Sequence, residues 1–309
     1  MFDSLKIKKN FINYLGIIYF VLFLSLILLN SCSIQQLAAK ATSSLIQDGL
    51  ASISAETDLI LAESGAATSL TLVEGLLKSD PDNINIRLAA AQGYTGYALA
   101  FAEDQSKSRA LELYKRGRNH ALHAWSLIAK QNNINTPETS LLINLKELRK
   151  YLSELGEEYI PVIYWTANSW AGMINNSRNS PLLLADIPIV MELASFITTH
   201  EPGFGYAGAH LILGSLGGTV PSFLGGSPII SQQHFDLAIK LTDGKFLMSY
   251  VLYAQIYAVQ MQDYELFKSL LEQVLSSPPN LLPEQGLANS IARIRAKYLM
   301  MTGEELFES

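Results

Sequence analysis

Residues 246–275 read FLMSYVLYAQIYAVQMQDYELFKSLLEQVL, and this stretch decides the fold class. Its large side chains follow a helical period, because Tyr250, Tyr253, Tyr257, Met261 and Tyr264 are spaced i, i+3, i+7, i+11 and i+14. This spacing puts all five on one face of an α-helix, whereas a half-buried strand would alternate apolar and polar residues. We therefore expect a helix whose aromatic face packs against a neighbouring helix.

Similar helices recur along the chain between short polar breaks. Each break contains Pro, Gly or Asx residues, which end one helix and cap the next. The breaks lie at residues 79–83, 200–203, 242–244 and 277–280. Apolar helices are predicted before them, over residues 70–77, 189–197, 235–241 and 267–275. Helices rich in Ala, Tyr or Leu are predicted after them, over residues 86–102, 206–213, 246–261 and 287–300.

The spacing of these breaks approaches the tetratricopeptide period of about 34 residues, with insertions. No convincing run of alternating apolar and polar residues occurs between residues 45 and 307. The sequence therefore predicts an all-α fold, a tetratricopeptide-like stack of helical hairpins (an α-solenoid). Such a stack presents a concave groove to a ligand or a partner.

The composition excludes two classes of protein. The chain has 309 residues, of which 49% are hydrophobic and 16% charged, with a formal net charge of −6. An apolar composition of this kind argues against intrinsic disorder, and the acidic balance provides no basic field for a nucleic-acid backbone. The single cysteine permits neither an intrachain disulfide nor a cysteine-based zinc site.

The N-terminus resembles the signal of a bacterial lipoprotein. Basic residues precede an apolar run over residues 11–29, and the run ends in LNSC at residues 29–32. Cys32 stands where a lipobox needs a thiol, and several acyl chains on one residue anchor a protein stably. We expect residues 1–31 to be a lipoprotein signal peptide, 32–48 a lipidated tether and 49–309 the helical-hairpin repeat domain. The alternative is a plain membrane anchor, because the run is long enough to span a bilayer.

The motifs that could carry chemistry are weak. His120 and His123 could face one metal, but the third ligand is missing, and packing of the two imidazoles is the simpler interpretation. The glycine-rich segment at residues 214–219 lacks the lysine of a phosphate-binding loop, and no nucleophile elbow occurs. We therefore expect no enzyme activity, no cofactor and no metal site.

The segment around two tryptophans is a better candidate. Trp165 and Trp170 lie about 140° apart on a helix, so they cannot share one narrow stripe. One of them is expected to pack in the core and the other to face a groove. Asn168 offers a donor and an acceptor beside the rings, while core packing of the whole segment remains the alternative.

Taken together, these segments resemble the T component of tripartite ATP-independent periplasmic (TRAP) transporters, the TatT family of tetratricopeptide-like lipoproteins. The similarity covers nearly all of the chain after the signal. Its motifs are Ser79-Asp80-Pro81-Asp82-Asn83, Leu113-Tyr114-Lys115-Arg116, Tyr164-Trp165, Trp170-Ala171-Gly172, Gly208-Ala209-His210-Leu211, Pro221, Gly225-Gly226, Gln262-Asp263, Leu287-Ala288-Asn289 and Arg295-Ala296.

The resemblance implies a non-catalytic, periplasm-facing lipoprotein scaffold. Members of this family form homotrimers, dock the substrate-binding P component and carry an internal pore for an apolar or amphipathic organic ligand. Ser33 after the modified cysteine favours the outer over the inner membrane. The alternative function is a lipid-anchored tetratricopeptide-type adaptor that binds peptides or proteins in envelope assembly, with a groove lined by Asn, Lys and Arg.

The expected site residues fall into three groups. Cys32 carries the lipid. The loop candidates, for a partner or the pore mouth, are Pro221, Gly225 and Gly226. The candidates for the ligand site or pore are Trp165, Asn168, Trp170, Gly172, His210, Tyr250, Tyr253 and Tyr257.

Overall fold

The computed structural model describes residue 19 and residues 44–133, 144–220 and 226–307. The chain divides into two units, Met1–Asp48 and Gly49–Ser309, and the fold described here is that of the second unit. Within the described ranges every regular element is a helix and no strand occurs. The predicted all-α class is confirmed, whereas the tetratricopeptide-like repeat remains a prediction.

In the first half of this unit three helices begin at side-chain caps, of which Asn83 lies in a predicted break and Asp58 and Ser106 do not. Asp58 caps α2 (Leu59–Ser79), Asn83 caps α3 (Ile84–Tyr97) and Ser106 caps α4, each by accepting backbone N–H groups of the first turn. The other elements are the π-helix η1 (Ala98–Ala102), α4 (Lys107–Gln131), α5 (Leu145–Leu152), η3 (Glu157–Tyr159) and α6 (Ile160–Asn176).

The second half continues the helical order. Its elements are α7 (Pro181–Ala185), α8 (Ile187–His200), α9 (Phe204–Thr219), α10 (Pro228–Leu241), α11 (Met248–Leu252), the π-helix η5 (Tyr253–Ala258), α12 (Tyr264–Ser276), η6 (Pro283–Gln285), α13 (Gly286–Thr302) and η7 (Gly303–Leu306). The breaks predicted at residues 200–203, 242–244 and 277–280 all lie between these helices.

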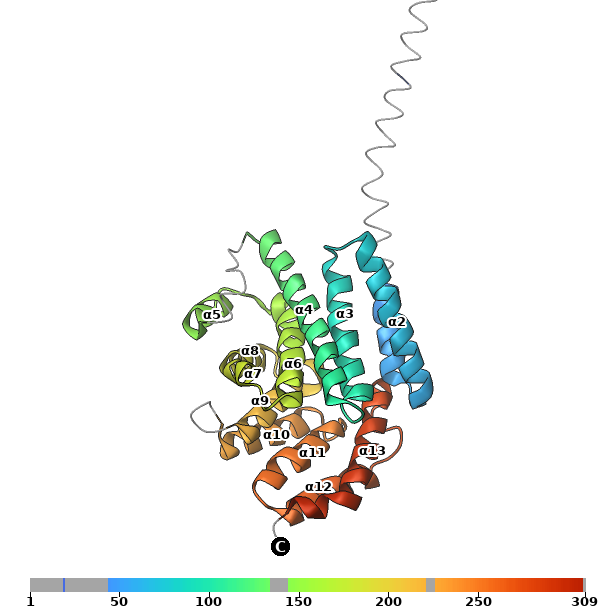
Figure 1. Cartoon of the computed structure of the whole chain (residues 1–309), viewed down its shortest axis with the longest axis vertical. Helices are drawn as coiled ribbons and strands as arrows, with labels where there is room; N and C mark the ends of the chain where they lie inside the picture. Colours follow the sequence, from blue (N-terminus) through green and yellow to red (C-terminus); the bar gives the residue numbers. More distant parts are fainter. Residues whose placement is uncertain (1–18, 20–43, 134–143, 221–225, 308–309) are drawn as a thin grey trace, which may run out of the picture. The chain divides into compact units, whose positions relative to one another are not determined.

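The helices pack in chain order and then return to the start. α2, α3, α4 and α6 lie side by side, and α9 to α13 form the lower part of the same view (Figure 1). α6 contacts α9 as well as α3, α4 and α8, and α13 contacts α2. Because the last long helix meets the first, residues far apart in the sequence can border one internal space.

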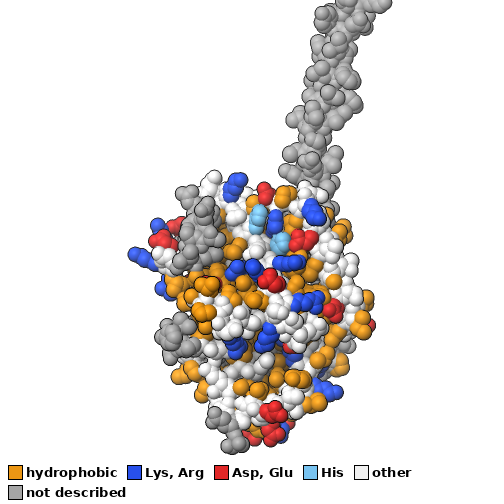
Figure 2. All heavy atoms as spheres, viewed as in Figure 1, with side chains coloured by type: hydrophobic (Ala, Val, Ile, Leu, Met, Phe, Trp, Pro, Cys, Tyr) orange, Lys and Arg blue, Asp and Glu red, His pale blue; other side chains and the backbone are white. Residues whose placement is uncertain are grey.

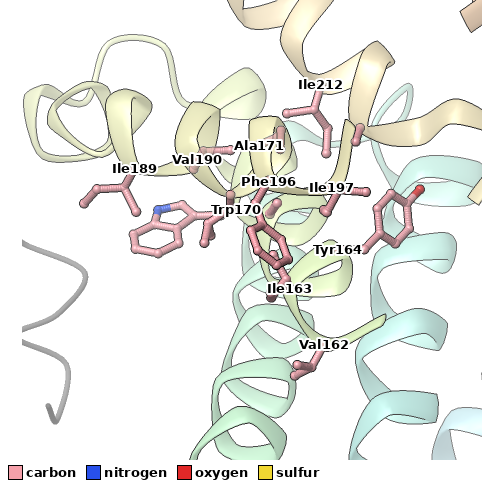
Figure 3. Packing of buried hydrophobic residues seen from close by; sticks show 14 of the residues in the cluster. Val162, Ile163, Tyr164, Trp170, Ala171, Ile189, Val190, Phe196, Ile197 and Ile212 are labelled. Carbon is pink, nitrogen blue, oxygen red and sulfur yellow. The ribbon is translucent and has the colours of Figure 1, made fainter. Parts of the chain in front are cut away.

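Two groups of buried residues form the core. One centres on α4, α6 and α8, and the other on α10 to α13, with α9 contributing to both. In the first group, Trp170 and Tyr164 point to different sides of α6, and Trp170 lies near Ile189 and Val190 of α8 (Figure 3). α6 is therefore buried on several sides, which explains its nearly continuous apolar sequence.

One described helix, α2, is long and apolar enough to cross a bilayer by length and composition alone. Its two carboxylates turn inward, since Tyr97 donates to Glu63 at 3.0 Å and Tyr94 donates to Glu74 at 2.8 Å. These bonds join α2 to α3, so α2 is an integral helix of the folded unit.

The predicted aromatic stripe is shorter in the structure than the sequence suggests. The helix that holds Tyr250, Tyr253 and Tyr257 ends before Gln262, which has a left-handed backbone at φ 55°. Asp263 then caps α12 by accepting the N–H of Leu266 at 2.9 Å, and Tyr264 begins that new helix. The prediction that Met261 and Tyr264 continue one helical face is therefore wrong, because a capped turn interrupts it.

Candidate functional site

A cavity of about 290 Å³ lies where the two halves of the helical unit meet. Residues of α3, η1, α4 and α6 border it from one half, and residues of α9, α11, η5 and α13 from the other. Its lining residues are Thr95, Leu99, Glu103, Asp104, Lys107, Tyr114, Tyr164, Asn168, Ala171, Gly172, Asn175, Asn176, Arg178, Gly205, Gly208, Leu211, Ile212, Ser215, Phe246, Met248, Leu252, Gln255, Ile256 and Arg295.

Three stretches of unusual backbone border this cavity. The π-helix η1 contributes Leu99, and the π-helix η5 contributes Gln255 and Ile256. At the start of α9, Gly205, Tyr206 and Ala207 form a left-handed turn with φ of 57–59°. Non-glycine residues in this conformation cost roughly 1–2 kcal/mol each, and π-helical turns occur frequently at functional sites. Their convergence on one cavity marks it as the candidate functional site.

One end of the cavity is built around the carboxylate of Glu103. This carboxylate accepts hydrogen bonds from the Tyr114 hydroxyl at 2.7 Å and the Asn176 amide at 2.9 Å, and it pairs with Arg295 at 3.2 Å. Arg295 also binds Asp104 at 2.9 Å and the carbonyl of Leu99 at 2.8 Å. The network joins α13 to η1 and the loop after it, although these segments are nearly two hundred residues apart.

The environment of this network keeps its groups in defined charge states. Burial would lower the pKa of the Arg295 guanidinium, but the neighbouring Glu103 and Asp104 carboxylates outweigh burial and raise it. Burial and the Glu103 carboxylate raise the pKa of the Tyr114 hydroxyl well above its ordinary value. Arg295 therefore stays charged and Tyr114 stays a neutral donor at physiological pH.

The opposite wall is aromatic and apolar. The Tyr164 ring lies 4.9 Å from Trp165 and 5.1 Å from Phe204, both edge-on, and burial raises the pKa of its hydroxyl. Asn168 donates to that hydroxyl at 3.2 Å. Gly205 and Gly208 face the ring so closely that a side chain at either position would displace it. Tyr164 is thus held as a fixed part of the wall.

The lining differs from the channel that the sequence led us to expect. Low charge and aromatic faces predicted an apolar channel with few polar contacts, but Asn, Arg, Lys, Asp and Glu side chains share the wall with apolar ones. The charged members come from residues 103–107 and from Arg178 and Arg295, and none of them was among the predicted site residues. The cavity is accordingly amphipathic.

Two of the predicted ligand residues line the cavity, namely Asn168 and Gly172. Trp165 is half-buried beside Tyr164 and is not among the lining residues. Trp170 is buried, donates to Asp186 at 3.0 Å and lies under the Arg118 guanidinium at 4.9 Å. The expectation that one tryptophan packs fits Trp170.

The three predicted tyrosines pack away from the cavity. Tyr253 is buried with its ring stacked on Phe235 at 5.0 Å, and Tyr257 is buried with its hydroxyl donating to Gln232 at 3.1 Å. Tyr250 is half-buried. The cavity is instead lined by their neighbours Met248, Leu252, Gln255 and Ile256. A role of these tyrosines in ligand contact remains a prediction without a place in this cavity.

The other candidates also lie outside the cavity lining. His210 of α9 is buried, with its Nδ1 2.9 Å from Nδ1 of His234 on α10. Gly226 is buried before α10, beside Ser227, whose N–H donates to the carbonyl of Gly217 at 2.9 Å. Cys32, Pro221 and Gly225 lie outside the described residues. No group of three or more metal-ligating side chains occurs in the described part of the chain.

The cavity residues that sequence reasoning missed are Glu103, Tyr114, Asn176 and Arg295. Tyr114 and Arg295 stand in motifs that carried the family resemblance, which was the available signal. Glu103 and Asn176 carry no such signal, because a polar residue at a helix end is usually a solvated one. Only the fold shows that these two side chains meet.

Fold and site together define a helical protein with an amphipathic cavity between the two halves of its helical unit. The sequence model of the TRAP transporter T-component family matches residues 55–307, and the chain belongs to that family. A search of curated proteins finds no match. Membership makes the chain a component of a TRAP transport system, which indicates a membrane-associated, periplasm-facing location.

Proposed function

We propose that this chain is a lipoprotein scaffold that docks the substrate-binding P component of its TRAP transporter and passes an organic ligand through the cavity. The observation that carries the proposal is the convergence of two π-helices and one left-handed turn on a partly open cavity of about 290 Å³. That volume suits a small organic molecule. The family supplies the transport context.

The ligand is apolar or amphipathic, and the mixed lining favours an amphipathic one. Leu252, Ile256 and Phe246 offer apolar contact, while Asn168 and Gln255 offer hydrogen bonds. Binding sites of this kind use apolar surface for affinity and a few polar groups for orientation. The scaffold itself contributes shape and no reaction.

Acylation of Cys32 holds the scaffold at the membrane, with residues 32–48 as its tether, and the scaffold acts as a homotrimer. Tethering keeps a soluble partner near the bilayer by raising its effective concentration. The mass of the chain purified from membranes tests the anchor, since cleavage before Cys32 and addition of acyl chains both change it. An intact, unmodified N-terminus would exclude lipidation.

The cavity is tested by filling it. Leu252 is half-buried in the lining, so Leu252→Trp places an indole in the space at a cost of about 1–3 kcal/mol. Native mass spectrometry of the full-length lipoprotein measures three things: small molecules retained, oligomeric state and complex formation with a candidate P component. We expect the variant to lose the retained molecule while keeping its oligomeric state.

Leu182→Trp is the matched control, because Leu182 is 82% exposed and lies outside the cavity lining. It should retain the molecule as the unaltered chain does. A folded Leu252→Trp variant that retains the molecule would refute the ligand route. An unaltered chain that forms no complex with the P component would refute the docking role.

A second candidate is the peptide- or protein-binding adaptor. It is favoured by the Asn, Lys and Arg side chains in the lining, including Asn175, Lys107 and Arg178. A space of about 290 Å³ holds a small molecule better than an extended peptide, which is why we rank this candidate second. The same mass spectra separate the two, because a retained peptide would establish the adaptor.

A further inference from the structure

Two arginines of α4 lie on tyrosine rings of α3 in a repeated arrangement. The Arg109 guanidinium is 5.4 Å from the Tyr97 ring centroid, and Arg116 is 5.7 Å from that of Tyr94. Each tyrosine hydroxyl donates to a glutamate of α2, as described above. The order glutamate, tyrosine, arginine therefore occurs twice across three neighbouring helices.

A third arginine extends the pattern along the same seam. Arg87 of α3 donates to the carbonyl of Pro81 at 2.9 Å and lies 3.1 Å from Nδ1 of His120. His120 is stacked on Tyr94, with ring centroids 5.7 Å apart and an interplanar angle of 3°. We call Arg87, Arg109 and Arg116 the arginine row.

Two arginines of the row are held in place by tyrosines that also bind glutamates of α2, and the Arg116 guanidinium interacts electrostatically with the Glu74 carboxylate. Tyr97 accepts a hydrogen bond from Arg109 at 3.2 Å, which restrains that guanidinium. In the described residues no ion pair joins any of the three arginines to a carboxylate, although Arg295 and Arg149 have such pairs. Arg109 and Arg116 are exposed. A stacked guanidinium keeps donors at its edge, where a carboxylate can bind in bidentate fashion.

The charge of the surrounding surface strengthens this feature. α4 carries Lys107, Arg109, Lys115, Arg116, Arg118 and Lys130 against a single acidic residue, Glu112, in a chain of net charge −6. On the face seen in Figure 2, Lys and Arg side chains gather over α3 and α4, with Asp, Glu and His side chains among them. A contact between an arginine and a tyrosine ring stabilises the fold by about 0.5–1 kcal/mol. Such contacts account for Arg109 and Arg116, but they do not account for the other basic residues of α4.

We propose that the arginine row is the docking surface for an acidic face of a partner protein, which under the proposed function is the P component. The inference rests on that function. α3 and α4 also wall the cavity, through Thr95 and Lys107. A partner seated on the row therefore contacts the two helices that border the ligand space.

A protein fits the row better than an anionic membrane does. Asp80, Asp82 and Glu112 are exposed on the same two helices or at their start. A continuous sheet of phosphates would meet these carboxylates as well as the arginines, and like charges repel. A folded protein can instead place individual carboxylates opposite individual guanidiniums, which gives specificity and faster association.

The experiment measures the dissociation constant between the full-length lipoprotein and the P component at about 50 and about 500 mM salt. The double variant Arg109→Gln/Arg116→Gln removes two charges while keeping polar side chains. We expect binding to weaken about tenfold or more at low salt, mainly through slower association, and its salt dependence to flatten. Lys240→Gln/Lys297→Gln is the matched control, because both lysines are exposed on other helices.

A second pair of substitutions separates charge from stacking. Arg109→Lys/Arg116→Lys keeps both charges and should retain most of the salt dependence, while circular dichroism and thermal melting verify that each variant is folded. If the unaltered chain binds the P component and the glutamine variant binds it equally well at both salt concentrations, the docking surface is wrong and the proposed function stands. If the unaltered chain does not bind it, the proposed function fails. A row-dependent preference for phosphatidylglycerol over phosphatidylcholine vesicles, with unchanged partner affinity, would assign the row to lipid instead.

Discussion

Gly172 shows what a single residue contributes to this cavity. It is buried on α6 with the Tyr114 ring of α4 directly against it, and its carbonyl accepts a hydrogen bond from Asn176 at 2.9 Å. The sequence analysis gave Gly172 as a ligand or pore candidate, and the structure shows that it also makes room for the Tyr114 ring. Because Tyr114 also donates to Glu103, a shift of its ring would disturb the polar end of the cavity.

We predict that Gly172→Ala destabilises the protein by about 1–3 kcal/mol, because the added methyl group would overlap the Tyr114 ring. The control is Gly96→Ala on α3, where an added methyl group meets nothing within 4 Å. That substitution should stabilise the helix by roughly 0.5–1 kcal/mol through its better propensity. Chemical denaturation measures both, and equal effects of the two substitutions would contradict the close packing at Gly172.

At the scale of elements, π-helices and one left-handed turn decide which side chains reach the cavity. In η5 the wider turn places Gln255 and Ile256 at the cavity, while Tyr253 and Tyr257 pack against α10. A regular period of 3.6 residues does not describe such a segment. The packing of α9 against α10 adds a second feature of this scale, the pair formed by buried His210 and half-buried His234.

The histidine pair predicts a pH dependence of stability. Burial and the neighbouring His234 lower the pKa of His210 to about 4, from an ordinary value of 6.5. The unfolded chain therefore takes up the proton first, so stability is complete above pH 6.5 and is lost as the pH falls toward 4. Each unit of pKa difference contributes at most about 1.4 kcal/mol, and solvent around the half-buried His234 reduces this, so we expect a loss of about 1–3 kcal/mol.

Denaturation at about pH 7 and about pH 4.5 tests this, because His210→Gln should reduce the difference between the two conditions. His200→Gln, at an exposed position on α8, serves as the control and should leave that difference unchanged. An unaltered pH dependence in His210→Gln would mean that the pair does not oppose protonation.

At the scale of the whole molecule, Arg295 joins the two halves of the helical unit. Its side chain is 11% exposed and connects α13 with Glu103, Asp104 and the carbonyl of Leu99. A largely buried ion pair contributes to stability only while both partners are present, because removing one partner leaves an uncompensated charge in the protein. The network therefore couples the C-terminal helix to the cavity.

We predict that Arg295→Met destabilises the protein by about 2–4 kcal/mol, because Glu103, whose side chain is only 19% exposed, then loses its cation. The control is Lys268→Met, which removes an exposed lysine paired with Glu272 at 3.9 Å and should change stability by less than about 0.5 kcal/mol. Thermal and denaturant unfolding measure both. A small effect of Arg295→Met would show that the halves are held by apolar packing alone.

The sequence by itself determined the helical class, the breaks and the family. Local signals suffice for the four predicted breaks, because a cap such as Asn83 acts within one turn of its own helix, whereas the cap at Asp263 was not predicted. The resemblance rested on the order of motifs along the chain, and the matching family model confirms it.

Only the tertiary structure decided which residues border the cavity. A side chain in the core and a side chain in a cavity wall both read as buried, so periodicity cannot separate Tyr257 from Ile256. The pairing of Glu103 with Arg295 spans most of the folded unit, and no local pattern predicts such a contact. The physical reason is that helix formation depends on neighbours in the sequence, whereas a cavity is formed by the packing of helices from both halves of the unit.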